Sequence, residues 1–122
     1  MSPYILILIS VLLGAVGQIF LKQGMSQFGA GFSVASFLDT NNLLKMVSNK
    51  FIVLGFINYG IATVVWLTIL TKMDVSKAYP FLSFGYVITA VLAVYYLNES
   101  FSSYRWIGIF LMVLGGYFLF KS

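Results

Sequence analysis

Three charged side chains of this sequence could act together on one anionic group. Lys22 follows the first of four long apolar runs, Glu99 follows the third, and Arg105 lies at the start of the fourth. If each run crosses a membrane as a helix, all three lie at the same membrane face. Lys supplies a point charge and Arg a planar fork of donors, which together suit an oxyanion, and Glu99 would orient one of them. The competing interpretation is a headgroup-level ion pair that fixes helix ends and contributes at most about 1 kcal/mol.

A second set of candidates is uncharged and lies inside the apolar runs, where a polar side chain is costly. Ser10, Gly14 and Gly17 lie on one side of the first run, at spacings of three and four residues. Gln18 continues that side toward Lys22 and the membrane surface. A face this narrow predicts either close helix packing through small residues or a path for a substrate, and both interpretations stay open.

Aromatic and hydroxyl side chains share faces in the second and third runs. Tyr59 and Trp66 lie two turns apart in the second run. Tyr79, Ser83 and Tyr86 share a face of the third run, which begins next to Pro80. An aromatic stripe is more typical of packing than of a binding wall. The candidate lining of a polar groove is nevertheless drawn from these faces: Gln18, Trp66, Tyr79 and Ser83.

Composition excludes several kinds of chemistry. The sequence contains no Cys and no His, and its acids are Asp39, Asp74 and Glu99. Disulfides, thiolate chemistry and the usual transition-metal sites are therefore excluded, and the scattered acids provide no catalytic pair. We expect no catalytic residue, metal or cofactor, so the chain is not predicted to be an enzyme. The net charge of +4 comes from Lys and Arg near the ends of the apolar runs, which suits anionic lipid headgroups and does not indicate nucleic acid.

Four apolar runs must position these side chains. Only 8% of the residues are charged and 61% are apolar, whereas a soluble domain has about 25% charged residues. A helix needs about 20 apolar residues to cross the hydrocarbon layer. The last run is shorter and reaches that length with interfacial Tyr104 and Trp106 and a snorkelling Arg105. The sequence predicts an all-α integral membrane protein with a single four-helix transmembrane domain over residues 1–122 and helices at 3–21, 51–71, 77–97 and 103–120.

The first run is expected to remain in the protein as a helix. No positively charged stretch precedes Pro3, and the apolar run is longer than the core of a typical signal peptide. Lys22 follows the run directly, as in a helix that anchors itself at the membrane face.

The connections between the runs predict the topology. Residues 39–50, between the first two helices, form an amphipathic segment in which Leu43, Leu44 and Val47 share a face. We expect a short interfacial helix there, with Lys45 as a surface charge. The connections 72–77 and 98–103 are short, so helices two, three and four are successive antiparallel neighbours. Three Lys at one membrane face oppose four Lys and Arg at the other, which leaves the orientation open.

Glycines in the fourth run predict association with another chain. Gly108 and Gly115 lie two turns apart, and Gly116 is adjacent. Such a stripe lets another helix approach backbone to backbone. Because four helices do not easily enclose a pathway, we expect a dimer, either a homodimer or a heterodimer with a sister four-helix chain.

Short matches along all four runs resemble one family. They are Val16-Gly17-Gln18, Lys22-Gln23, Trp66-Leu67, Ala78-Tyr79-Pro80-Phe81-Leu82-Ser83, Glu99, Arg105-Trp106 and Gly108. In order and spacing they are similar to the four-helix, small multidrug resistance-like members of the drug/metabolite transporter superfamily, and most of all to subunits of the aminoarabinose-phosphoundecaprenol flippase. Small multidrug resistance exporters carry a proton-binding acid midway along the first helix. Gly14 stands at the matching position, which disfavours drug antiport.

The resemblance implies a flippase subunit that moves a polyprenyl-phosphate-linked sugar, or a similar amphiphile, across a bacterial inner membrane. Lys22 and Arg105 would then hold the phosphate, and Glu99 would orient one of them or meet the ammonium of an amino sugar. The implied groove residues are Gln18, Trp66, Tyr79 and Ser83. The implied partners are the lipid-linked sugar phosphate, membrane lipids and a second four-helix chain. Two alternatives remain: a small multidrug resistance-type exporter of small cationic molecules with non-standard coupling, and a non-transporting membrane partner of a glycosyltransferase.

Overall fold

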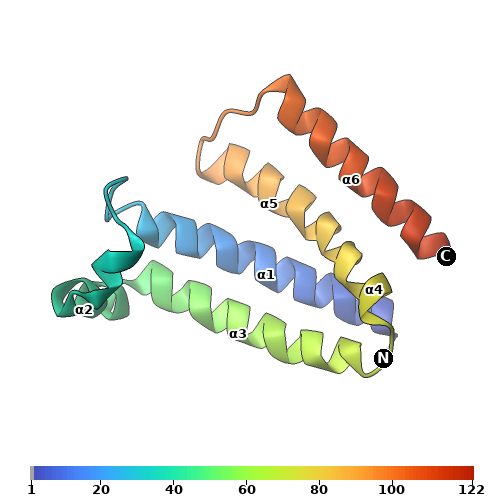
Figure 1. The fold of residues 1–122 in the computed structure, drawn as a ribbon, viewed down its shortest axis with the longest axis horizontal. Helices are drawn as coiled ribbons and strands as arrows, with labels where there is room; N and C mark the ends of the chain where they lie inside the picture. The colour runs from blue at the N-terminus through green and yellow to red at the C-terminus, as the bar shows by residue number, and fades with distance from the viewer. Residues whose placement is uncertain (1) are drawn as a thin grey trace.

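Helices and their connections make up the described chain, which is residues 2–122 of a computed structural model; residue 1 lies outside it (Figure 1). In chain order the elements are α1 (Pro3–Met25), η1 (Val34–Leu38), α2 (Thr40–Ser48), α3 (Lys50–Leu70), α4 (Val75–Ala78), η2 (Tyr79–Phe81), α5 (Leu82–Tyr96) and α6 (Ser103–Lys121). Four helical segments are long and apolar enough to cross a membrane: α1, α3, the continuous run from α4 through η2 to α5, and α6. The prediction of an all-α integral membrane protein, with a short helix between its first two spans, is confirmed.

Polar side chains fix where four of the helices begin. Ser2, Asp39, Asn49 and Ser102 precede α1, α2, α3 and α6, and the side-chain oxygen of each accepts a hydrogen bond from a backbone amide of the first turn. Those amides have no partner within their own helix. The caps at Asp39 and Asn49 therefore separate the amphipathic α2 from η1 on one side and from the span α3 on the other.

Two helices differ in detail from the sequence prediction. α1 continues to Met25, beyond the predicted end at residue 21, because Lys22 and Gln23 are good helix formers. The third span is interrupted by the 3₁₀ turn η2, which contains Pro80. Proline lacks the amide that an α-helical hydrogen bond requires, so the chain tightens there. The turn changes the angular register between Tyr79 and the helix that follows.

The four spans lie side by side in the order α3, α1, α5 and α6, with both chain ends at the same end of the layer (Figure 1). α1 is central, because it packs against both α3 and α5. α6 lies at one edge and packs against α5 and η2. The most buried apolar cluster joins three of the spans near the chain ends and consists of Ile7, Val11, Ile69, Ala78 and Phe81.

The contact between α1 and α3 is close because glycines line it. A Cβ atom at Gly17 would lie 3.1 Å from the carbonyl oxygen of Gly55, and one at Gly55 would lie 3.0 Å from the carbonyl oxygen of Gly17. A Cβ atom at Gly24 would collide with the side chain of Ile52. Lipid tails are as apolar as the side chains, so close packing of backbones is what joins these two helices.

Aromatic rings hold the C-terminal end of α6 against the rest of the protein. Tyr4, Phe81 and Phe120 form a triad with ring centroids 5.3 to 6.1 Å apart. Next to this triad, Gly116 lets Phe84 of α5 approach, because a Cβ atom at Gly116 would lie 3.2 Å from that ring. The C-terminal half of α6 is thus held by rings from the N-terminal end of α1 and from η2 and α5.

The glycine contact between α1 and α3 predicts a difference between two substitutions in α3. Gly55→Leu should lower the free energy of unfolding by about 1–3 kcal/mol, because its Cβ atom would overlap Leu21 and the Gly17 backbone. Gly60→Leu is the matched control, since a Cβ atom there meets nothing within 4 Å. Thermal unfolding in detergent, followed by circular dichroism, measures both. Equal midpoints for the two variants would show that the glycine contact does not hold the helices together.

Candidate functional site

A groove of uncharged polar and aromatic side chains opens between α1, α3 and α5. It consists of two adjoining cavities of about 230 and 340 Å³, which share Ser10, Gly14, Tyr59 and Leu82. We call it the central groove, and its other lining residues are Val11, Ala15, Gln18, Ala62, Thr63, Trp66, Tyr79, Gly85, Tyr86 and Thr89. None of these lining residues carries a charge. The groove therefore suits a neutral polar group and offers nothing to neutralise a buried ion.

Two glycines of α1 decide where that helix packs and where the groove opens. Gly17 is in contact with the backbone of Gly55, whereas a Cβ atom at Gly14 would meet nothing within 4 Å. Gly14 instead lines the central groove. The small-residue face is thus divided: it packs against α3 at Gly17 and lines an open cavity one turn earlier at Gly14, where a path for a substrate stays a prediction.

Some polar groups of the central groove are already engaged. The Ser10 hydroxyl donates to the carbonyl oxygen of Ala62 at 3.1 Å, and the Thr63 hydroxyl donates to the carbonyl oxygen of Tyr59 at 2.9 Å. The Gln18 amide and the tyrosine phenols of the groove have no hydrogen-bond partner within residues 2–122. These are groups that both donate and accept, which is what sugar hydroxyls require.

The central groove contains three of the four residues predicted to line it. Gln18, Trp66 and Tyr79 belong to its lining, and the rings of Trp66 and Tyr79 meet edge to face with centroids 6.2 Å apart. Ser83 lies on the opposite side of α5, where its hydroxyl oxygen is 3.2 Å from the Cβ position of Gly116. That hydroxyl is buried and has no hydrogen-bond partner in the described chain. The 3₁₀ turn η2 separates Ser83 from Tyr79 in register, so of the three residues predicted to share a face, Tyr79 and Tyr86 line the central groove and Ser83 does not.

The three charged candidates lie at the same end of the layer but have separate surroundings. Lys22, one helical turn after Gln18, lines a cavity of about 490 Å³ formed with the residues that follow α1. The Arg105 guanidinium lies 5.0 Å from the centroid of the Phe101 ring and donates a long hydrogen bond of 3.5 Å to a carbonyl oxygen of its own connection. Glu99 is in that same connection. Within residues 2–122 no ion pair or hydrogen bond joins Lys22, Glu99 and Arg105, because α5 stands between α1 and α6 (Figure 1).

Four polar or aromatic residues of the central groove were not among the predicted candidates: Tyr59, Thr63, Tyr86 and Thr89. Tyr59 and Tyr86 each lie seven residues from a candidate on the same helix, and that spacing is the signal that identifies them. Thr63 has no such signal, because its hydroxyl bonds to its own helix one turn back. A threonine satisfied in this way is tolerated on any face of a membrane helix.

A layer of four helices long and apolar enough to span a membrane defines a small multi-pass membrane protein, and its uncharged polar groove fits a transporter. The model of the EamA-like transporter family matches residues 32–121 of this sequence. The chain belongs to the EamA-like transporter family.

Several curated proteins are similar to this chain over most of its length. One is 32% identical over 93% of this chain and 88% of its own length, and is named a probable 4-amino-4-deoxy-L-arabinose-phosphoundecaprenol flippase subunit ArnF, from Proteus mirabilis. A second protein of that name, from Shewanella sediminis, is 34% identical over 91% of this chain and 82% of its own length. A probable subunit ArnE of the same flippase, from Pectobacterium atrosepticum, is 30% identical over 95% of this chain and 96% of its own length. No solved structure matches the chain.

If the central groove holds water, a cysteine in it should react with a water-soluble maleimide. The chain has no cysteine, so single substitutions need no altered background. Thr63→Cys should be labelled, because the reactive thiolate forms only where water reaches it. Val64→Cys should stay unlabelled, because Val64 lies at the same depth of α3, is 65% exposed and would face lipid. Labelling of purified protein in lipid nanodiscs, quantified by mass, makes the comparison. Identical labelling of both variants would contradict a water-filled groove.

Proposed function

We propose that this chain is one subunit of a flippase that moves a polyprenyl-phosphate-linked sugar across the bacterial inner membrane. The observation that carries the proposal is the uncharged, polar and aromatic lining of the central groove between α1, α3 and α5. The names of the similar ArnE and ArnF proteins agree with this substrate class.

The side chains of the central groove suit a sugar in chemistry. Tyrosine rings present apolar faces to the sugar ring, and the phenols and the Gln18 amide exchange hydrogen bonds with its hydroxyls. Tyr59, Tyr79 and Tyr86 are 46%, 63% and 54% exposed, so the lining is not closed off on all sides. A polyprenyl chain can therefore remain in the lipid while the sugar moves along the helices.

Lys22 is the proposed contact for the phosphate. It lies on α1 one turn beyond Gln18, where the central groove ends and the membrane surface begins. A lysine ammonium there neutralises a phosphate without bringing charge into the hydrocarbon layer. Arg105 and Glu99 would contact the substrate headgroup at the same membrane face, from the other side of α5. Glu99 would pair with the ammonium of an amino sugar if the substrate carries one.

Drug antiport remains the less favoured function. Export of small cations against a proton gradient needs an acidic residue in the membrane that binds proton and cation in turn. The central groove contains Gly14 at the relevant point of α1 and no carboxylate anywhere in its lining. The groove can therefore not hold a cation by charge.

A second four-helix chain would complete the pathway. The spans form an open layer with α6 at its edge, and the central groove has walls from only three of them (Figure 1). Cβ atoms at Gly108 and Gly115 would meet nothing within 4 Å, so this part of α6 is free to receive another helix. The proposed dimer, with a copy of this chain or a sister chain, uses that face.

Loss of the Lys22 charge should weaken substrate binding. Lys22→Ala is expected to bind a glycosyl phosphoundecaprenol about tenfold or more weakly, since a hydrogen bond to a charged group contributes about 1.5–3 kcal/mol. Lys72→Ala is the control, because it removes the same charge from the connection at the opposite membrane face. Arg105→Ala should have a smaller effect, because Arg105 lies beyond α5. Native mass spectrometry of the purified proteins ranks the variants. Parent-like binding by Lys22→Ala would mean that this lysine only anchors the end of α1.

Substitutions of neighbouring glycines in α6 should separate assembly from folding. The double variant Gly108→Leu with Gly115→Leu should lose the crosslinked dimer in native membranes while keeping its thermal stability, because both positions are open. Gly116→Leu should instead destabilise the protein by about 1–3 kcal/mol, because its side chain would overlap Phe84. A dimer that survives the double substitution would rule out this face of α6 as the interface.

A further inference from the structure

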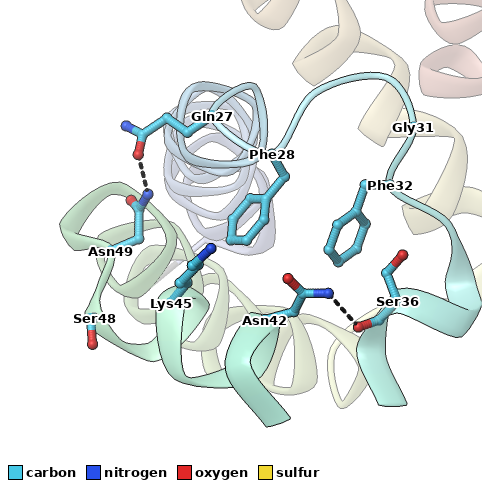
Figure 2. A pocket seen from close by; sticks show the side chains of 9 residues that line it. All are labelled: Gln27, Phe28, Gly31, Phe32, Ser36, Asn42, Lys45, Ser48 and Asn49. Carbon is cyan, nitrogen blue, oxygen red and sulfur yellow. Dashed lines mark hydrogen bonds between the residues drawn. The ribbon is translucent and has the colours of Figure 1, made fainter. Parts of the chain in front are cut away.

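The connection between α1 and α3 forms an open cavity of its own, away from the central groove. Its volume is about 590 Å³, within the range of small-molecule sites. Figure 2 shows its walls: the turn after α1 on one side and α2 with the start of α3 on the other. We call it the surface pocket, and its side chains include Gln27, Phe28, Phe32, Asn42, Lys45 and Asn49.

Hydrogen bonds and ring contacts give the surface pocket a fixed shape. The Asn49 amide donates to the Gln27 side-chain oxygen at 2.8 Å, which ties the start of α3 to the turn after α1 (Figure 2). The Asn42 amide donates to the carbonyl oxygen of Ser36 at 3.0 Å. The rings of Phe28 and Phe32 meet edge to face with centroids 5.1 Å apart. The lining is therefore organised before a ligand arrives, which lowers the entropic cost of binding.

The residues that line the surface pocket favour an anionic ligand that also carries hydroxyl groups. Lys45 contributes the only charge among the lining residues, and its ammonium has no ion-pair or hydrogen-bond partner in the part of the chain that the structure describes. In Figure 2 the Lys45 amine points between Phe28 and Asn42. Amides that keep free donors and acceptors, beside aromatic rings, match the hydroxyls and apolar faces of a sugar or polyol.

The far side of α2 indicates the depth of the surface pocket in the membrane. Leu43, Met46 and Val47 line an apolar groove that α2 forms with α3. An amphipathic helix lies with such a side in lipid and its polar side toward the headgroups. Asn42 and Lys45, on the side of the surface pocket, then stand at headgroup depth.

Shared residues connect the surface pocket to the proposed transport path. Phe32 lines both the surface pocket and the cavity that contains Lys22. Lys22 in turn lies one helical turn from Gln18 of the central groove. The surface pocket, the cavity that contains Lys22 and the central groove therefore follow one another from the connection after α1 into the layer of helices.

We propose that the surface pocket binds the phosphorylated, hydroxyl-bearing headgroup of a lipid, with Lys45 on the phosphate and Phe32 and Asn42 against the sugar or polyol. The identity of that lipid as the transported substrate rests on the proposed flippase function. The same chemistry occurs in a lipid-linked sugar phosphate, in phosphatidylglycerol and in a free sugar phosphate. The proposal that a headgroup binds in the surface pocket depends only on the residues that line the pocket.

Removal of the Lys45 charge tests the proposal. The full-length protein in phosphatidylcholine nanodiscs is titrated with glycosyl phosphoundecaprenol, phosphatidylglycerol or glucose 1-phosphate, and binding is followed by native mass spectrometry. Lys45→Gln should weaken binding of at least one probe about tenfold. Lys50→Gln is the matched control at the same membrane face, because Lys50 lies over the Phe51 ring at 5.3 Å and is outside the pocket lining. Phe32→Leu keeps most of the apolar volume and should also weaken binding because the ring is lost, and it is compared with Lys45→Gln at a temperature where both variants are folded.

The three probes separate this proposal from the flippase proposal. Dependence on Lys45 for the glycosyl lipid alone supports a substrate site, and equal dependence for phosphatidylglycerol or glucose 1-phosphate supports a headgroup site of broader specificity. If the flippase proposal fails, binding of those two probes still depends on Lys45. If the surface pocket proposal fails, Lys45→Gln binds all three probes like the parent, even where Lys22→Ala weakens the glycosyl lipid.

Discussion

The close contact between α1 and α3 is the constraint on which the rest of the structure depends. Within a bilayer the burial of apolar surface does not drive helices together, so association needs backbones that approach and pack. Gly17 and Gly55 provide this contact, with Cβ positions 3.0 to 3.1 Å from the opposite carbonyl oxygens. One turn away, at Gly14, the same face of α1 meets nothing within 4 Å. The central groove begins where this contact ends, so the same two helices provide both the stability and the cavity.

The bilayer also determines where the charged side chains lie along the chain. Every Lys, Arg, Asp and Glu lies outside the uncharged interior of the spans, while the interior carries phenols, hydroxyls and one exposed amide at Gln18. An uncharged groove lowers the cost of moving polar hydroxyls but cannot carry a phosphate. In the proposed flippase, cations at the membrane face would hold the phosphate, and Lys22 and Lys45 line two cavities that share Phe32. This separation of neutral interior and cationic surface matches an amphiphile better than a free cation.

The spans could be predicted from the sequence because hydrophobicity over about 20 residues depends on no distant contact. Features that depend on which residues of a neighbouring helix face a given side chain could not be predicted from the sequence. Whether a small residue of α1 packs against α3 or lines a cavity depends on which residue of α3 faces it. The sequence therefore did not distinguish the roles of Gly14 and Gly17. Ser83 was assigned to the groove by a continuous helical period, which the 3₁₀ turn at Pro80 interrupts. Lys45 was expected to be a surface charge, and its side chain is exposed. That it also lines the surface pocket could not be predicted, because the pocket depends on a hydrogen bond between Asn49 and Gln27 that a linear pattern does not reveal.

The order of the spans explains why one helix has so few contacts. α1 has 28% of its apolar window buried, whereas α6, at the edge of the layer, has 11%. Its aromatic contacts at the C-terminal end form the triad of Tyr4, Phe81 and Phe120, and Ile109 is its one buried apolar side chain nearer to Ser103 in the described chain. A helix in lipid needs no cover for its apolar side chains, but the glycines at 108 and 115 weaken it as an isolated helix by about 1 kcal/mol each relative to alanine. That cost is offset where another backbone packs against them. The same association would supply a wall that three spans of one chain do not provide for the central groove.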